Sequence, residues 1–414
     1  MAFSRPLNVP RQWTENGKAS MTKEVDQELL GIDELIDMVV QSELGDEAAV
    51  KKYCDGIRPY NIMLSFHPMV PNTTVCRNVF KVFVHYVIVL YLSDDKLEKM
   101  SKEDLETTYA IFARLNEQNR KRLPSIPTIQ EMKQSMSKDT NFVGPILGFT
   151  HLVNRLAFIL LVQGNYPTEL VYEFRLRVSN MIALYFQAIA AEKHPEKKNT
   201  AVECAWRRIF GGAALAINTC AEVFSDSLGK IPQHKATITE LHLLSQVYIS
   251  SINDLYSYFY ECHTNSDNLP HALVVGNEAD NPREATCKIA EILDAIMMYI
   301  YKKAEEIKLK NPNSPELYDV FNRIGQMMIG CYYMHLHLPR YQKSQLAFTL
   351  VEVNEKELPN WLTTGSKYGA GIVQSLLEVM RERMADGKMD AMYGAIGLHG
   401  REFGENGDGL FLIK

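Results

Sequence analysis

The chain lacks the features of several common protein classes. Its formal net charge is −6, so it has no basic excess of the kind that proteins use to bind nucleic acids. Its seven cysteines form no C-x-x-C pair and no spacing typical of a zinc site, which favours reduced thiols inside a cell over a disulfide framework. The sequence begins without the apolar segment of a secretory signal. We therefore expect a cytoplasmic protein that does not bind nucleic acid.

Long hydrophobic runs are also scarce. The most apolar stretch, from Val79 to Leu92, is interrupted by Lys81 and His85 and is too short to cross a bilayer. We expect no membrane span. The alternation typical of strands is hard to find, and no repeat of fixed period is visible. These absences leave helices as the main element.

What the chain does contain is one apolar helical run after another. Hydrophobic residues make up 46% of the 414 residues, enough for a sizeable core. Many runs are apolar on most faces, which indicates buried rather than surface helices. The expected helices cover residues 25–40, 75–92, 102–119, 149–162, 169–193, 201–224, 239–263, 283–310, 315–337 and 371–384. We therefore predict an all-α protein built as a single large helical bundle.

The two ends of the chain differ from this bundle. Residues 1–25 are polar and form an expected N-terminal arm, residues 26–345 form the bundle, and residues 346–414 form a C-terminal extension. The extension ends in a glycine-rich stretch without a phosphate-loop pattern, so we assign no chemistry to its glycines. It either packs on the bundle as a cap or mediates formation of a homodimer.

An oxygen-rich motif lies at residues 253–261. Asn253, Ser257 and Glu261 recur at intervals of four, so on a helix they share one face, spread over about 80° of arc and about 12 Å of length. An amide oxygen, a hydroxyl and a carboxylate then point the same way. Oxygen ligands of this kind suit Mg2+ together with substrate phosphate oxygens. A polar stripe exposed to solvent is the alternative explanation.

A second acidic group follows the most apolar run. Asp94, Asp95 and Glu98 place three carboxylates within about a turn and a half of helix. A solvated helix end would explain an isolated cluster, but a helix buried on nearly all sides brings these carboxylates close to the interior. Clustered carboxylates near a core repel one another unless cations compensate them. Two oxygen-rich sites on two long helices therefore suggest several metal ions that hold a polyanion.

Basic residues suited to such a polyanion occur at two places. Arg207 and Arg208 interrupt an otherwise apolar helix, and Arg340 with Tyr341 ends another. Arginine suits phosphate oxygens because its planar guanidinium donates two parallel hydrogen bonds. For Arg207 and Arg208, an ion pair with a neighbouring helix is the alternative. Gly211, which precedes a second glycine, marks either close helix packing or a break in the helix.

These motifs and their order resemble those of class I terpene cyclases of the microbial type, which also occur in octocorals. The residues 253–261 match the N-D-x-x-S-x-x-x-E motif of that family, and the acidic group at 94–98 matches its aspartate-rich motif. Asn253 lies 46 residues after Arg207 and 87 residues before Arg340, a layout similar to the family's. The resemblance covers roughly residues 60–345.

The resemblance implies a lyase with the bundle of class I terpenoid synthases. Three Mg2+ ions held by the two motifs would bind the diphosphate of a linear isoprenoid, which the enzyme ionises and cyclises with release of diphosphate. Geranylgeranyl diphosphate is the favoured substrate and farnesyl diphosphate the second choice. The expected residues are six metal ligands, Asp94, Asp95, Glu98, Asn253, Ser257 and Glu261; four catalytic residues, Arg207, Gly211, Arg340 and Tyr341; and five substrate contacts, Ile88, Tyr91, Arg208, Phe210 and Met334.

Three positions depart from the family pattern. Tyr260 stands where many relatives carry a lysine before the last glutamate of the motif, so one diphosphate contact is expected to differ. Met334 replaces an aromatic residue six positions before the arginine–tyrosine pair. Phe210 replaces a polar residue that links the sensor arginine to the helix break. For Phe210 and for Tyr91, ordinary core packing is the alternative to a place in the cavity.

Two other functions stay open. A prenyl diphosphate synthase shares this bundle, but its pattern has a second aspartate-rich motif where this chain has the motif at 253–261. A helical interaction protein that retains a relic site is the non-enzymatic alternative. We assign no metal to His335 and His337, because side chains two residues apart on a helix point in different directions.

Overall fold

The computed structural model divides into two compact units. It describes residues 3–20, 30–57, 70–97, 99–120, 125, 127–136, 143–192, 200–211, 220–228, 235–261, 268–338, 341 and 346–385. We name the units after the helices that carry the two predicted motifs, α6 (Thr74–Leu97) and α14 (Lys235–Glu261). The α6 unit contains the described residues from 30 to 192, and the α14 unit contains residues 3–20 and the described residues from 200 onward.

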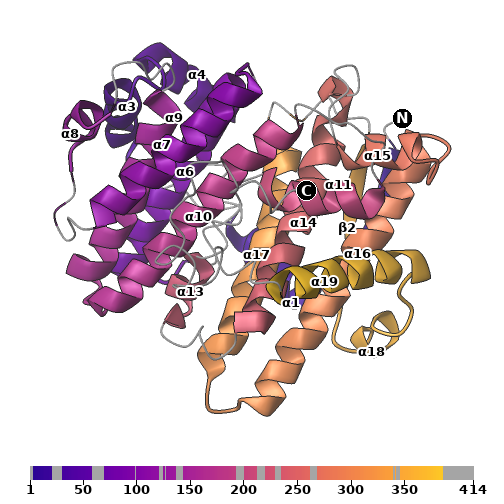
Figure 1. Ribbon diagram of the computed structural model, residues 1–414. Helices are drawn as coiled ribbons and strands as arrows, with labels where there is room; N and C mark the ends of the chain where they lie inside the picture. The colour runs from indigo at the N-terminus through magenta and orange to yellow at the C-terminus, as the bar shows by residue number, and fades with distance from the viewer. Residues whose placement is uncertain are drawn as a thin grey trace. The chain divides into compact units, whose positions relative to one another are not determined.

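Long helices that pack side by side form the α6 unit (Figure 1). Helix α9 contacts α6, α7 and α10, and α10 also contacts α7. Phe149 of α9 lies at the centre of an aromatic cluster, with its ring centroid 5.3 Å from Tyr86, 5.8 Å from Phe186 and 6.3 Å from Tyr185. The elements are α3 (Ile32–Gln41), α4 (Glu47–Ile57), α6, α7 (Lys102–Arg120), α8 (Ile129–Gln134), α9 (Val143–Phe158), the π-helical turn η2 (Ile159–Gln163) and α10 (Thr168–Glu192).

Helix α6 is buried over most of its length, as its apolar sequence predicts. It reaches Leu97, past the expected end at residue 92, so the backbone of Asp94 and Asp95 is helical. By length and composition, the segments Thr74–Asp94 and Val143–Gln163 could each span a membrane. Most residues of both segments are buried by the rest of the protein, which is typical of core helices.

Helix α14 is the central element of the second unit. It contacts α11, α15, α16 and α17, and α16 in turn contacts α17 and α19. Helix α16 starts where its sequence indicates, because Asn281 accepts hydrogen bonds from the backbone of Arg283 and Glu284, and Pro282 fills the first turn. The elements are α1 (Arg11–Ser20), α11 (Ala201–Gly211), α13 (Cys220–Phe224), α14, α15 (Leu269–Val275), α16 (Pro282–Lys310), α17 (Pro315–His337), α18 (Leu358–Trp361) and α19 (Lys367–Ala385).

A two-stranded parallel sheet, which the sequence did not predict, pairs the start of the described chain with the segment that follows α17. Strand β1 (Phe3–Pro10) pairs with β2 (Leu346–Val353) from Phe3 opposite Leu346 to Pro10 opposite Val353. Proline is compatible with β1, because both strands of a two-stranded sheet are edge strands. The polar arm and the extension expected at the two ends thus meet in this sheet.

Helix α1 anchors the same end of the chain in the α14 unit. The indole of Trp13 is 1% exposed, packs 5.9 Å from the ring of Tyr301, and donates a hydrogen bond of 3.1 Å to the Asn322 side chain. Gly325 of α17 leaves room for it, since a Cβ at that position would lie 2.4 Å from the indole. The prediction of an all-α fold is confirmed by the helices of both units, with this small sheet as an addition.

Candidate active site

Helix α14 carries the oxygen-rich motif at its carboxyl end. Because the helix runs unbroken from Lys235 to Glu261, Asn253 and Ser257 lie one turn apart on one face, as their spacing predicts. Ser257 is 4% exposed and Asn253 is half-buried. Ser257 Oγ lies 3.5 Å from the carbonyl oxygen of Asp254, at the limit of a hydrogen bond. The hydroxyl is therefore only weakly engaged by the helix that carries it.

The amide of Asn253 is held by residues at the end of α17. Its Nδ2 atom donates to the Tyr341 hydroxyl at 3.0 Å and lies 3.2 Å from His335 Nε2. Both partners are 2% exposed, and their rings pack with centroids 4.5 Å apart. Tyr341, which the sequence predicts for diphosphate binding, is thus brought next to the first residue of the motif.

The groups around His335 stay uncharged. Burial raises the pKa of the Cys331 thiol, whose sulfur lies 3.5 Å from His335 Nδ1, and it raises the pKa of the Tyr256 hydroxyl. A buried thiol with a raised pKa forms little thiolate, so Cys331 and His335 are not suited to act as a nucleophile and its base. His335 instead contacts the motif through Asn253, and Cys331 packs beside His335.

Asp254, the second residue of the motif, forms a buried ion pair. Its carboxylate is completely buried, pairs with the guanidinium of Arg208 on α11, and accepts a hydrogen bond of 2.8 Å from the backbone N–H of Leu269. The Ser250 hydroxyl also donates to the Arg208 carbonyl at 3.0 Å. The sequence predicts a substrate contact for Arg208, with an ion pair to a neighbouring helix as the alternative. The structure shows the ion pair, which fixes α11 to α14 beside Asn253.

Asp94 of the aspartate-rich motif is oriented by a tyrosine within the α6 unit. The hydroxyl of Tyr185 on α10 donates to Asp94 Oδ1 at 2.9 Å. Tyr185 itself is fully buried in the aromatic cluster around Phe149, whereas Asp94 is half-buried. A rigid, buried donor therefore holds one oxygen of a more exposed carboxylate.

The remaining predicted residues are either buried or half-buried, or they lie outside the described part of the chain. In α6, Ile88 is fully buried and Tyr91 is half-buried, three residues before Asp94. Met334 of α17 is 7% exposed. The side chains or whole residues that lie outside the described part of the chain are Asp95, Glu98, Arg207, Phe210, Gly211, Tyr260, Glu261 and Arg340.

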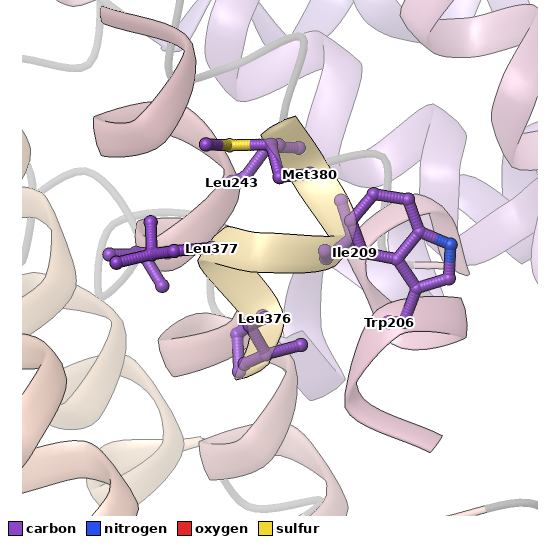
Figure 2. Close-up of a pocket in the computed structure, with 8 residues that line it drawn as sticks. Trp206, Ile209, Leu243, Leu376, Leu377 and Met380 are labelled. Carbon is purple, nitrogen blue, oxygen red and sulfur yellow. The ribbon is translucent and has the colours of Figure 1, made fainter. Parts of the chain in front are cut away.

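A hollow near α14 does not belong to this site. It lies between α11, α14 and α19 and holds about 10 Å3, which is about the room of one water molecule. Its walls are wholly apolar, and Figure 2 labels six of the residues that line it, among them Trp206 of α11 and Leu377 and Met380 of α19. It is a packing gap, far too small for an isoprenoid.

The described donors fit Mg2+ rather than a softer metal. Asn253 supplies an amide oxygen, Ser257 a hydroxyl and Asp94 a carboxylate oxygen, which are the hard ligands that Mg2+ prefers. Among the described residues, no group of three or more His, Cys, Asp or Glu could hold a metal ion.

Sequence reasoning missed three residues that support the motifs. Asp254 had a detectable signal, because a carboxylate in an apolar helix needs a cation and Arg208 was available. Tyr185 and His335 had none, since each acts on a residue more than 80 positions away in the chain. Contacts of that kind depend on how helices pack, not on local periodicity.

Comparisons with known proteins identify the fold. No protein-family model and no curated protein matches the chain. Among solved structures, a variant of cucumene synthase has a TM-score of 0.54 at 15% identity, covering 81% of this chain and 98% of its own. The 2-methylisoborneol synthase of Streptomyces coelicolor A3(2), solved with Mg2+ and 2-fluoroneryl diphosphate, has 0.53 at 14% identity, covering 82% and 96%.

A third match supports the same assignment over more of the chain. A variant of the SVS_A2 protein from ancestral sequence reconstruction has a TM-score of 0.57 at 12% identity, covering 92% of this chain and 98% of its own. At such low identity the likeness concerns the fold. The chain has the fold of the class I terpene synthases.

Proposed function

We propose that this protein is a Mg2+-dependent class I terpene cyclase. It ionises a linear isoprenyl diphosphate, cyclises the resulting carbocation to a terpene and releases diphosphate. The observation that carries the proposal is the motif on α14. Asn253 and Ser257 share one helix face, and the amide of Asn253 is fixed by Tyr341, in a chain with the fold of terpene synthases.

The residues act mainly by binding and orientation. Asn253, Ser257 and Glu261 would hold a cation at the end of α14. Asp94, Asp95 and Glu98 of the aspartate-rich motif would hold further cations. Bound Mg2+ would stabilise the negative charge that develops on the diphosphate. Arg207, Arg340 and Tyr341 bind the diphosphate oxygens, and such preorganised donors lower the barrier to cleavage of the carbon–oxygen bond.

The allylic cation needs an apolar surrounding that excludes water. The proposal assigns contacts with the isoprenoid to Ile88, Tyr91, Phe210 and Met334, since aromatic faces stabilise positive charge, and it assigns a contact with the cation to the carbonyl of Gly211. Arg208 acts one step away, because its ion pair with Asp254 positions the motif. Geranylgeranyl diphosphate is the preferred substrate in this proposal, with farnesyl diphosphate second. That the 2-methylisoborneol synthase binds 2-fluoroneryl diphosphate with Mg2+ supports the substrate class.

A product assay tests the proposal directly. The purified protein is incubated with C10, C15 or C20 isoprenyl diphosphate and Mg2+, and the products are separated by gas chromatography and mass spectrometry. A cyclic hydrocarbon or alcohol together with free diphosphate supports the proposal. A longer isoprenyl diphosphate would identify a prenyl diphosphate synthase instead. Folded protein that releases no diphosphate from any substrate would favour a helical interaction protein.

Two variants with matched controls then test the site. Asp94→Ala and Asn253→Ala are each expected to lower turnover about 100-fold or more, because each removes a ligand of the charge-stabilising cations. Asp37→Ala and Asn313→Ala change exposed residues of the same types and should keep wild-type turnover. Circular dichroism checks that the helical content is unchanged. Wild-type activity in either site variant would remove that side chain from the site.

A further inference from the structure

The amide nitrogen of Asn253 is bonded from two sides within the α14 unit. Tyr341 Oη lies 3.0 Å from Nδ2, and His335 Nε2 lies 3.2 Å from the same atom. A primary amide carries two hydrogens on its nitrogen, so these two neighbours can accept one each. The position of the oxygen Oδ1 then follows from the position of the nitrogen.

The tautomer of His335 decides which way the amide faces. His335 Nδ1 lies 2.8 Å from the backbone carbonyl oxygen of Cys331, which can only accept a hydrogen bond. Nδ1 must therefore carry a hydrogen. With this hydrogen on Nδ1, the neutral tautomer has an acceptor at Nε2, and the atom of Asn253 that lies 3.2 Å from it is the amide nitrogen.

The surroundings hold this arrangement rigid. The ring of His335 packs 4.5 Å from Tyr341 and 5.7 Å from Tyr256, measured between centroids. Tyr341 N–H donates to the carbonyl of Leu338 at 3.0 Å, which fixes the turn after α17. Tyr332, one turn before His335, donates its hydroxyl hydrogen to the Phe348 carbonyl of β2 at 2.9 Å. Rotation of the amide would place its oxygen against His335 Nε2, so that two acceptors would face each other.

We propose that His335 and Tyr341 are positioning residues that present Asn253 Oδ1, rather than its nitrogen, as a cation ligand. This inference rests on the proposed function, since the ligand role of Asn253 is part of it. If the side-chain amide of Asn253 were rotated by about 180°, its N–H groups would face the cation and could not bind it. Removal of a residue that orients a metal ligand commonly lowers the metal affinity 10- to 100-fold.

Four variants test the proposal, three of them on α17. His335→Phe keeps a ring against Tyr341 but removes the acceptor. His335→Gln places an amide oxygen where Nε2 lies and restores it. His337→Phe makes the same change at a half-buried histidine two residues away and is the control. Tyr341→Phe removes the second acceptor and keeps the ring.

The first readout is binding of inorganic diphosphate, measured by calorimetry as a function of Mg2+ concentration. We expect His335→Phe to raise the half-saturating Mg2+ concentration about 10-fold or more, with His335→Gln and His337→Phe close to wild type. In turnover, the loss should shrink at high Mg2+. An unchanged Mg2+ requirement in His335→Phe would overturn the proposal, as would an equal loss in His335→Gln.

The second readout needs neither substrate nor metal. In protein labelled with 15N-asparagine, the side-chain signal of Asn253 is assigned by its loss in Asn253→Ser. Both amide hydrogens should exchange slowly in the wild type and faster in His335→Phe. Fast exchange in the wild type would overturn the orientation. Wild-type protein that fails to bind Mg2+ and diphosphate while these hydrogens are protected would overturn the proposed function and the ligand role, but not the amide orientation.

Discussion

The guanidinium of Arg208 pairs with the carboxylate of Asp254, whose side chain is completely buried. The pair joins α11 to α14 at the residue that follows Asn253. Both residues belong to segments that the sequence singles out for chemistry, yet here they bind each other. Arg208, which the sequence predicts to contact substrate, thus supplies the positive charge that pairs with Asp254 of the motif.

Arg208→Met is expected to lower the free energy of unfolding by about 3 kcal/mol, because it leaves a buried carboxylate without its cation. Urea unfolding followed by circular dichroism measures the change. Arg11→Met is the control. Arg11 pairs with Glu15 at the surface, where both side chains are 59% exposed, so its loss should cost less than about 1 kcal/mol. Equal losses in the free energy of unfolding would show that the buried ion pair stabilises the protein no more than the surface pair does.

Tyr185→Phe should weaken Mg2+ binding through Asp94. The substitution removes the hydroxyl that donates to Asp94 Oδ1 but keeps the ring in its aromatic cluster. We expect the half-saturating Mg2+ concentration for turnover to rise about 10-fold. Tyr172→Phe, at a half-buried tyrosine of the same helix, should leave it unchanged. A rise in both variants, or in neither, would contradict a specific role for Tyr185.

Gly325→Ala is expected to destabilise the anchor of the N-terminal arm. The new methyl group would lie 2.4 Å from the indole of Trp13 and must displace it. Overpacking of this kind costs about 1–3 kcal/mol. The thermal midpoint should fall and the tryptophan fluorescence should shift to longer wavelength.

The control for Gly325→Ala is Gly371→Ala in α19, where a Cβ would meet nothing within 4 Å. Alanine favours a helix over glycine by about 1 kcal/mol, so this variant should be more stable than the wild type. A stabilised Gly325→Ala would mean that Trp13 is not held against α17.

The stability of the α6 unit should depend on pH through His85. Burial lowers the pKa of His85 to about 4, and the positive charge of Arg155 adds to the effect. The ring of the unfolded chain takes up a proton near pH 6.5. Between these values only the unfolded state is protonated, so the free energy of unfolding should fall as the pH drops from 6.5 to 4, by about 3 kcal/mol.

His85→Gln isolates this contribution. His85 Nε2 donates to the Leu30 carbonyl at 2.9 Å, and the glutamine amide can make the same bond without titrating. Urea unfolding at several pH values between 4 and 7 should show a shallower slope for the variant. Parallel curves would mean that the ring is already protonated in the folded protein.

The sequence predicts helices well where apolar periodicity is long. The expected ranges 169–193, 283–310 and 315–337 lie within one residue of α10, α16 and α17 at each end. The starts of α16 and α17 depend on residues close by in the sequence, such as the cap Asn281 and the first-turn residue Pro315. Strand β1 was missed because it contains two prolines and depends on a partner more than 300 residues away.

By itself, the sequence determined that Asn253 and Ser257 share one helix face and that Asp94 lies near the end of a buried helix, because helical spacing is a property of the local chain. Only the tertiary structure decided that Arg208 binds Asp254, that Tyr185 holds Asp94 and that His335 meets Asn253. Each of these contacts joins separate helices. The physical reason is packing. A buried polar group forms hydrogen bonds with the groups that the neighbouring helix places within reach, and the local sequence does not determine which groups these are.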